Sequence, residues 1–323
     1  MNRSPVLVVA LLLLSAVVFA EASDFSLDPA WPKLPDGWKF RMVSNIAGDS
    51  HGRIYVAHRG AHPIVFFDKT GKFLGSLGED VFQQSVNYNL TVNPPIPISR
   101  EYWVHGLHVD RWDNVWVTDL GRQVVIKLNP QGKLLMTLGT LDRSGEDEKT
   151  FHQPSSVAVA PSGHIYVSDG YGNSRIVKFS PDGKYLKTWG KKGSGPGEFD
   201  TPHGIAVDTQ GNVYVAERLN NRVQVFDSEG RFLAQWPGHL RADSIVLTRE
   251  GGAYVGTGKG DTRIYNLDLK GKLLAAFGAE ATFGYPHGMF VDSEGSLYVA
   301  DPVSDQASKP PRRFVKRTAP KGQ

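Results

Sequence analysis

Three histidines occupy the same position in three copies of one sequence motif. The copies read WVHGLHVDRWDNVWVTD at residues 103–119, TPHGIAVDTQGNVYVAE at 201–217 and YPHGMFVDSEGSLYVAD at 285–301, and they contain His105, His203 and His287. Three imidazoles around one point, with a fourth place open for water or substrate, match a catalytic zinc site. The alternative is that this position is a general feature of the repeat and accepts any polar residue. The elements that carry the histidines decide between the two interpretations.

Six segments of the chain share a turn followed by an aromatic residue and valine. The aromatic residues are Tyr55, Trp116, Tyr166, Tyr214, Tyr254 and Tyr298, spaced 40 to 61 residues apart. Self-similarity at a period of ~40 to 50 residues is typical of propeller blades. Within each unit, apolar residues alternate with period two between turn residues, which predicts four short antiparallel strands. We therefore predict an all-β fold, namely a six-bladed β-propeller.

The residue eleven positions before each aromatic residue opens the innermost strand of its blade, and we call it the inner position. In chain order this position holds Ser44, His105, Ser155, His203, Asp243 and His287. Histidine thus falls in units two, four and six. Alternate blades of a six-membered ring lie about 120° apart, so the three imidazoles should converge on the central axis. This alternation favours a shared zinc site over a general feature of the repeat.

Two arginines and a tyrosine fall in loops at the same end of the predicted blades. Arg59 and Arg218 stand four residues after the aromatic residue in units one and four, and Tyr171 stands five residues after it in unit three. Two guanidiniums above a metal suggest a substrate carboxylate, which arginine binds through a bidentate fork. Nearby positive charge favours the ionised form of a phenol, so Tyr171 is a candidate general base. The alternatives are ordinary loop packing for Tyr171 and solvent exposure for Arg218, while His58 and His62, which flank Arg59, are expected to support it or to lie at the surface.

Residues 1–22 have the features of a cleaved secretory signal peptide. An early basic residue precedes an apolar run from Val6 to Ala20, and the small residue Ala22 follows. This pattern is too short for a stable membrane anchor, and no later apolar run is long enough to span a bilayer. The chain has no cysteine, so disulfides play no part in its stability. We expect a secreted or periplasmic monomer without stable membrane insertion.

The repeats also set the expected domain boundaries. Residues 41–317 should form the propeller, and residues 318–323 a polar tail. The last unit lacks a clear fourth strand, which the N-terminal segment 23–40 could supply to close the ring. Insertions at 79–100 and 141–149 are expected as loops over one face of the ring.

The charge distribution and the motifs that are missing exclude several functional classes. Net charge is +3, and six basic residues follow Asp301, so the rest of the chain is close to neutral. It has no basic stripe of the kind that nucleic-acid binding needs. The sequence also has no nucleophile elbow, phosphate loop or dinucleotide fingerprint.

Four segments of the chain resemble a known enzyme family. FHQPSSVAVAPSGHIYVSDGYGNSRIVKFSPDGK, VHGLHVDRWDNVWVTD, TPHGIAVD and YPHGMFVD are similar to the lyase domain of peptide α-amidating enzymes, peptidylamidoglycolate lyase, which is built on NHL-type repeats. The likeness extends from about Val43 to Asp301. It implies a zinc ion held by the three histidines, Tyr171 as base, and Arg59 and Arg218 around the substrate carboxylate. The implied reaction cleaves a peptidyl- or N-acyl-α-hydroxyglycine to an amide and glyoxylate.

The chain departs from the family at one informative place. Tyr285-Pro286-His287-Gly288 stands where the animal enzymes have Met-Pro-His-Asp. Because a hard cation prefers carboxylate oxygen, the loss of this aspartate argues against the structural calcium of the family. Two other hypotheses stay open: a non-catalytic NHL propeller that binds a partner through one face, and a zinc enzyme acting on another carboxylated carbinolamide or amide.

Overall fold

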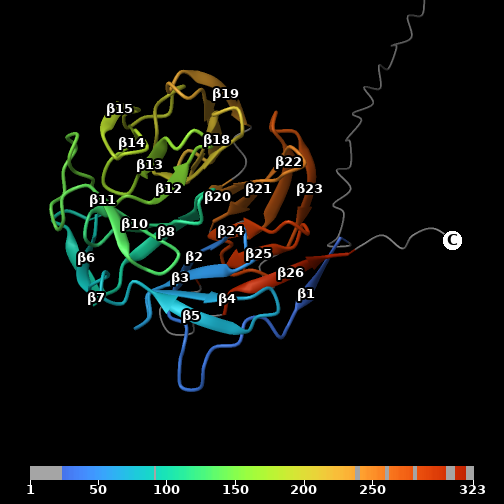
Figure 1. Cartoon of the computed structure of the whole chain (residues 1–323). Helices are drawn as coiled ribbons and strands as arrows, with labels where there is room; N and C mark the ends of the chain where they lie inside the picture. Colours follow the sequence, from blue (N-terminus) through green and yellow to red (C-terminus); the bar gives the residue numbers. More distant parts are fainter. Residues whose placement is uncertain are drawn as a thin grey trace, which may run out of the picture.

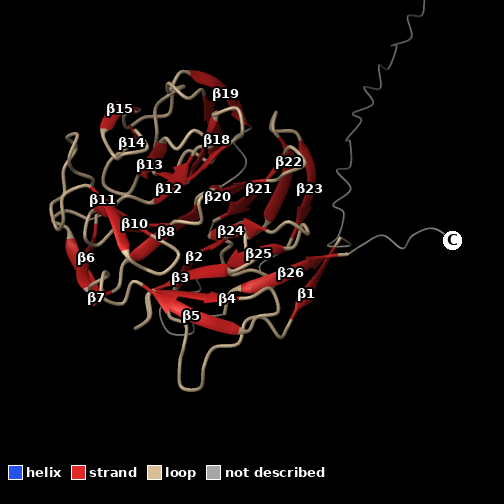
Figure 2. Ribbon diagram, in the orientation of Figure 1, coloured by secondary structure: helices blue, strands red, loops and turns tan. Residues whose placement is uncertain are grey.

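The computed structural model describes residues 24–90, 92–236, 241–258, 262–278, 282–302 and 310–317. The expected signal peptide and polar tail lie outside these residues. The described strands form six four-stranded antiparallel sheets around a central axis, and this confirms the predicted all-β, six-bladed propeller (Figures 1 and 2). The described part of the chain contains no helix long and apolar enough to cross a membrane.

The blades follow one another in chain order, and each runs from the inner strand to the outer one. Blades 1 to 3 consist of β2 (Val43–Gly48), β3 (Ile54–His58), β4 (Ile64–Phe67) and β5 (Phe73–Leu77); β8 (Val104–Val109), β9 (Val115–Asp119), β10 (Val124–Leu128) and β11 (Leu134–Leu138); and β12 (Ser156–Val159), β13 (Ile165–Asp169), β14 (Arg175–Phe179) and β15 (Tyr185–Trp189). Blades 4 and 5 consist of β16 (Pro202–Val207), β17 (Val213–Glu217), β18 (Arg222–Phe226) and β19 (Phe232–Trp236); and β20 (Ala242–Leu247), β21 (Gly252–Thr257), β22 (Ile264–Asp268) and β23 (Leu273–Phe277).

Blade 6 is assembled from both ends of the chain. It consists of β24 (Gly288–Val291), β25 (Leu297–Ala300), β26 (Arg312–Lys316) and, outermost, β1 (Phe25–Asp28). Strand β1 lies antiparallel to β26, with Phe25 opposite Lys316 and Asp28 opposite Arg313 (Figure 1). The ring of Phe25 stacks on Phe277 of blade 5 at 5.1 Å between centroids. The segment 23–40 thus contains the strand that completes the last blade and joins the ends of the ring.

A repeated aspartate explains why the aromatic signature recurs. In four blades the turn between the first and second strands carries Asp49, Asp110, Asp208 or Asp292. Each of these carboxylates accepts backbone N–H groups of the turn and also a hydrogen bond from the buried aromatic residue of the same blade, 2.8 to 3.1 Å long. The aromatic rings pack between blades, where their large apolar surface is removed from water. The turn and the ring are therefore fixed together, and each blade starts in the same register.

The insertion at 79–100 is not a plain loop. It contains a two-stranded hairpin, β6 (Ser85–Asn89) and β7 (Ile96–Glu101), which belongs to none of the six blades. Trp103 anchors it by donating its indole N–H to the carbonyls of Ser85 at 3.0 Å and Ser99 at 3.3 Å. A second anchor joins the buried Asn87 to Gln153 of the segment that precedes blade 3. The hairpin is therefore held at one end of the ring.

Candidate metal centre and substrate cleft

The structure brings the three predicted histidines together on the central axis. His105 and His203 lie in the inner strands β8 and β16, and His287 directly precedes β24. All three are buried, and their ring centroids lie 4.7 to 5.0 Å apart. One ring nitrogen of each lies within 4.8 Å of the other two. This spacing lets three nitrogens share one small cation.

Each imidazole is oriented by the blade that follows it. The Nδ1 atoms of His105, His203 and His287 lie 2.7, 2.6 and 2.6 Å from the backbone carbonyl oxygens of Ser155, Asp243 and Ser44. A carbonyl can only accept, so each Nδ1 must carry the hydrogen and each Nε2 keeps its lone pair. A hydrogen bond from the far ring nitrogen is the usual support of a histidine that ligates a metal.

A glycine after each histidine makes this contact possible. A β-carbon at Gly106 would lie 2.7 Å from Cα of Ser156, and one at Gly204 would lie 2.9 Å from the carbonyl oxygen of Asp243. The inner strand of the next blade therefore packs directly against the glycine, which brings its carbonyl within reach of Nδ1. The His-Gly pair is visible in all three sequence copies, but the sequence alone gave the glycine no role.

The same crowding bears on the family's structural calcium. A β-carbon at Gly288 would lie 2.6 Å from Cα of Asn45, so an aspartate has no space at this position. The residues present do not reproduce the carboxylate that the resemblance associates with calcium. We therefore assign no calcium site here.

The three histidines are neutral at physiological pH. Burial lowers the pKa of His105 and of His203 well below the usual value, and it lowers the pKa of His287 to about 3. The positive charge of Arg218 lowers all three pKa values further, and that of Arg59 lowers those of His105 and His287. A neutral imidazole with a free Nε2 is the form that binds a metal ion.

The donor set fits zinc. Tyr171 places its hydroxyl oxygen 3.0 Å from Nε2 of His105 and 2.9 Å from Nε2 of His203. A phenol has one hydrogen and can donate it to only one of these two acceptors. Three imidazole lone pairs that face one point suit a Lewis acid, and three histidines with one open coordination place are typical of catalytic zinc.

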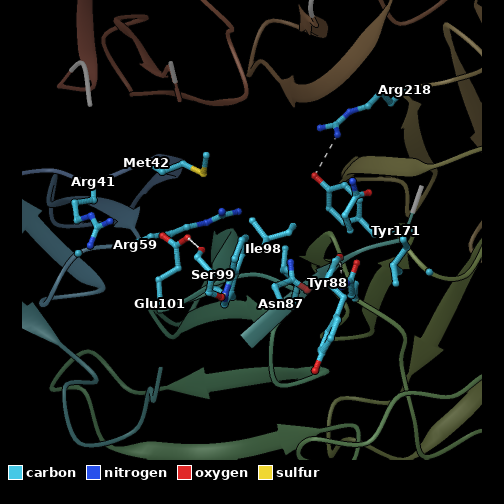
Figure 3. A pocket seen from close by; sticks show the side chains of 18 of the residues that line it. Arg41, Met42, Arg59, Asn87, Tyr88, Ile98, Ser99, Glu101, Tyr171 and Arg218 are labelled. Carbon is cyan, nitrogen blue, oxygen red and sulfur yellow. Dashed lines mark hydrogen bonds between the residues drawn. The ribbon is translucent and has the colours of Figure 1, made fainter. Parts of the chain in front are cut away.

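Arg218 lies beside Tyr171 and is fixed by Asp243. Its Nη1 donates to the Tyr171 oxygen at 3.2 Å (Figure 3). Its Nη2 donates to Nε2 of His203 at 2.6 Å. Its Nε forms an ion pair with the carboxylate of Asp243, which is fully buried. Sequence analysis placed Asp243 at the inner position of blade 5 but assigned it no function, because the pairing depends on two blades. Arg218 is thus an integral part of the centre and not a solvent-exposed loop residue.

Arg59 approaches the cleft from blade 1. Its guanidinium carbon lies 3.8 Å from the centroid of the Trp103 ring, a cation–π contact. Arg59 and Arg218 lie on opposite sides of the opening, with Ile98 and Tyr171 between them (Figure 3). Beside Arg59, His58 is buried and its Nδ1 accepts the backbone N–H of Arg41 at 3.3 Å and that of Gly60 at 3.2 Å. His58 therefore supports the loop that carries Arg59.

A cleft of about 1720 Å³ adjoins the centre through Tyr171 and Arg218, whereas the three histidines line a separate cavity of about 260 Å³. Arg59, Tyr171 and Arg218 line the floor of the cleft, the segment 32–42 and the hairpin β6–β7 line its sides, and it includes five basic but only two acidic side chains. Pockets for drug-sized ligands usually measure about 300 to 1000 Å³. This cleft can therefore hold an anionic ligand that is larger than a single amino acid.

Comparison with known proteins adds a family context. A family model described as a 6-bladed β-propeller matches residues 144–236. The chain is 33% identical over 313 residues to peptidyl-α-hydroxyglycine α-amidating lyase 1 of Drosophila melanogaster, covering 84% of this chain and 57% of that protein. The chain is a homologue of the amidating lyases. Homology also extends to NHL repeat-containing protein 3 of Mus musculus, at 33% identity over 226 residues, with 66% of this chain and 59% of that protein covered.

Further comparisons mark the extent of the likeness. Peptidylglycine α-amidating monooxygenase of Rattus norvegicus is 33% identical over 286 residues, which are 80% of this chain but only 29% of that protein. The chain therefore spans less than a third of this longer relative. Among solved structures, a gluconolactonase from Xanthomonas campestris superposes with a TM-score of 0.62 at 15% identity, covering 86% of this chain and 87% of that one. This last similarity concerns the fold alone.

Proposed function

We propose that the protein is a zinc-dependent lyase that cleaves the C–N bond of a peptidyl- or N-acyl-α-hydroxyglycine to an amide and glyoxylate. One observation carries the proposal: three neutral imidazoles converge on one point beside the hydroxyl of Tyr171 and between two arginines. The homologous amidating lyases support the reaction type. The features of residues 1–22 support a secreted or periplasmic location.

The bonds that change in this reaction are few. The substrate carries a hydroxyl, an acylated nitrogen and a carboxylate on one carbon. Loss of the hydroxyl proton lets the C=O bond of glyoxylate form while the C–N electron pair leaves with nitrogen. The same proton is returned to that nitrogen, so no water or redox partner is consumed. Catalysis therefore needs a base, stabilisation of a developing alkoxide, and a grip on the carboxylate.

Each need has a matching group in the centre. The Tyr171 oxygen takes the hydroxyl proton, and Arg218 donates a hydrogen bond to that oxygen at 3.2 Å. A zinc ion held by Nε2 of His105, His203 and His287 would supply Lewis-acid stabilisation of negative charge on the substrate oxygen. Arg59, whose guanidinium lies against the Trp103 ring at the other side of the opening, holds the substrate carboxylate.

The test combines metal analysis with a product assay. We expect purified protein expressed with zinc to carry about one zinc per chain and to release glyoxylate from N-benzoyl-α-hydroxyglycine. The carboxyl-amidated form of the same compound is the control, and it should react more slowly because it lacks the anion for Arg59. Metal content below about a tenth per chain, or the absence of glyoxylate from the zinc-loaded protein, would contradict the proposal and favour a propeller that binds a partner without turnover.

A further inference from the structure

The hairpin β6–β7 carries large apolar side chains that are exposed and are not part of the hydrophobic core. Tyr88, Ile96 and Ile98 are 47, 52 and 55% exposed. The hairpin has its own two-stranded pairing and is attached through Trp103 and Asn87. Exposed apolar groups of this kind mark interaction sites when they lie at a cleft.

Among these three residues, Tyr88 and Ile98 line the cleft and Ile96 does not. In Figure 3, Ile98 lies at the opening between Arg59 and Tyr171, whereas the Tyr88 ring points away from Arg218. Met42 also lines the cleft, and in the same view it lies close to Arg59, on the side of the opening away from Arg218 and Tyr171. Ile98 and Met42 therefore place apolar surface beside Arg59 at the opening.

One side chain couples this apolar region to the arginine. The ring of Trp103 lies under the guanidinium of Arg59, and its indole N–H binds the carbonyl of Ser99, the residue after Ile98. A ligand whose carboxylate reaches Arg59 must therefore pass next to Ile98. The α-carbon of an α-hydroxyglycine directs its hydroxyl to Tyr171 and its carboxylate to arginine, so only its acyl side is left to follow the cleft.

We propose that Ile98 and Met42 form a subsite for the side chain of the residue that precedes α-hydroxyglycine, so that the protein prefers peptides with a bulky apolar residue at that position. This inference rests on the proposed function for the orientation of the ligand. Arg59 binds the carboxylate end of the ligand, and the cleft is large enough for a peptide. The apolar side chains of Ile98 and Met42 lie where the side chain of the preceding residue must be. Burial of an apolar side chain against isoleucine and methionine supplies the free energy of selection.

The experiment compares two exposed isoleucines on one strand. Rates of glyoxylate release are measured with N-acetyl-Phe-α-hydroxyglycine and N-acetyl-Gly-α-hydroxyglycine for wild type, Ile98→Ser and Ile96→Ser. We expect wild type to favour the Phe substrate, and Ile98→Ser to lower kcat/KM for this substrate by about threefold to tenfold while leaving the Gly substrate unchanged. Ile96→Ser has nearly the same exposure outside the cleft and should behave like wild type. An equal loss for both substrates, or equal effects of the two variants, would overturn the subsite.

A binding measurement separates the subsite from the reaction. Calorimetry with N-acetyl-Phe-Gly and N-acetyl-Gly-Gly, which lack the reactive hydroxyl, reports affinity without turnover. If wild type releases no glyoxylate but binds the Phe peptide more tightly through Ile98, the proposed reaction is wrong and the subsite stands. If both hydroxyglycine substrates react without preference, the reaction stands and the subsite is wrong. If the protein neither reacts nor discriminates, both are wrong.

Discussion

Even and odd blades have the same four strands but use the inner position in opposite ways. In blades 2, 4 and 6 it holds a histidine whose Nδ1 bonds to the next blade. In blades 1 and 3 it holds Ser44 and Ser155, whose backbone carbonyls accept those bonds from the preceding blade. The serine hydroxyls in turn donate to the carbonyls of Val104 at 3.0 Å and Pro202 at 2.9 Å, the residues just before the next histidine.

Blade 5 modifies this arrangement in one respect. The carbonyl of Asp243 accepts the bond from His203 as the serines do, but its carboxylate pairs with Arg218. The hydroxyl that joins blade 5 to blade 6 comes instead from Ser244, 3.2 Å from the carbonyl of Pro286. The comparison shows a threefold arrangement within a six-bladed ring. Even blades supply the histidines, odd blades supply the carbonyls that orient them, and Asp243 of blade 5 also pairs with Arg218 of blade 4.

The strongest test removes a ligand from an even blade. His105→Ala, His203→Ala and His287→Ala should each lose zinc, and glyoxylate release should fall at least about a thousandfold, because a metal contributes several kcal/mol to transition-state stabilisation. Ser155→Ala is the odd-blade control, since it keeps the carbonyl and should keep zinc. Metal analysis and circular dichroism read out occupancy and fold. Zinc loss in only one of the three histidine variants would rule out the shared site.

The next test concerns the odd-blade side chain nearest the histidines. Tyr171→Phe keeps the ring that packs against His105 and His203 but removes the oxygen. We expect zinc content and fold to be unchanged and kcat to fall by about a hundredfold, the usual contribution of a general base. Turnover close to that of wild type would assign Tyr171 to packing and leave the base to be sought elsewhere.

Converting blade 5 into an ordinary odd blade should have a smaller effect. Asp243→Ser keeps the carbonyl that orients His203 but removes the carboxylate that pairs with Arg218. We expect retained zinc and about a tenfold lower kcat, because Arg218 is then less well placed beside Tyr171. Asp243→Asn, which preserves the shape, is the second variant in case the serine variant is unstable. Loss of zinc in Asp243→Asn would mean that the carboxylate, and not the carbonyl, supports the metal ligand.

Features that repeat from blade to blade could be predicted from the sequence, whereas features that occur once could not. The six aromatic residues and their turns recur along the chain, so the blades and the alternation of His105, His203 and His287 could be recognised without coordinates. The absence of a fourth strand in the last unit pointed to the N-terminal segment. The pairing of Asp243 with Arg218 has no local signal, because it joins residues of two blades. The hairpin β6–β7 lies in an insertion without a counterpart in other units, so its two strands could not be predicted from the repeat pattern.

A second position, at the end of the second strand, also differs between blades. In blades 3, 4 and 6 a buried acid pairs with the arginine that opens the third strand: Asp169 with Arg175, Glu217 with Arg222, and Asp301 with Arg312. In blade 2 the acid is Asp119, but Val124 occupies the place of the arginine. Among the described residues, Oδ2 of Asp119 has no hydrogen-bond partner, and burial raises the pKa of this carboxyl to about 7.

The last predicted effect is on stability and depends on pH. The folded state holds the Asp119 proton up to about pH 7, whereas the unfolded chain releases it near pH 3.8. Between these values the unfolded state binds fewer protons, so the contribution of Asp119 to stability is present at low pH and declines as pH rises towards 7. Asp119→Asn stays neutral, and it should exceed wild type in free energy of unfolding at pH 8 by an amount on the order of 1 to 4 kcal/mol that vanishes near pH 4. Urea unfolding at pH 4, 6 and 8 measures this difference. Asp169→Asn is the matched variant. It should be less stable than wild type at pH 8, because it leaves the buried Arg175 without its carboxylate. If Asp169→Asn were stabilised, or if Asp119→Asn gained no stability at pH 8, the arginine would not be what distinguishes these blades.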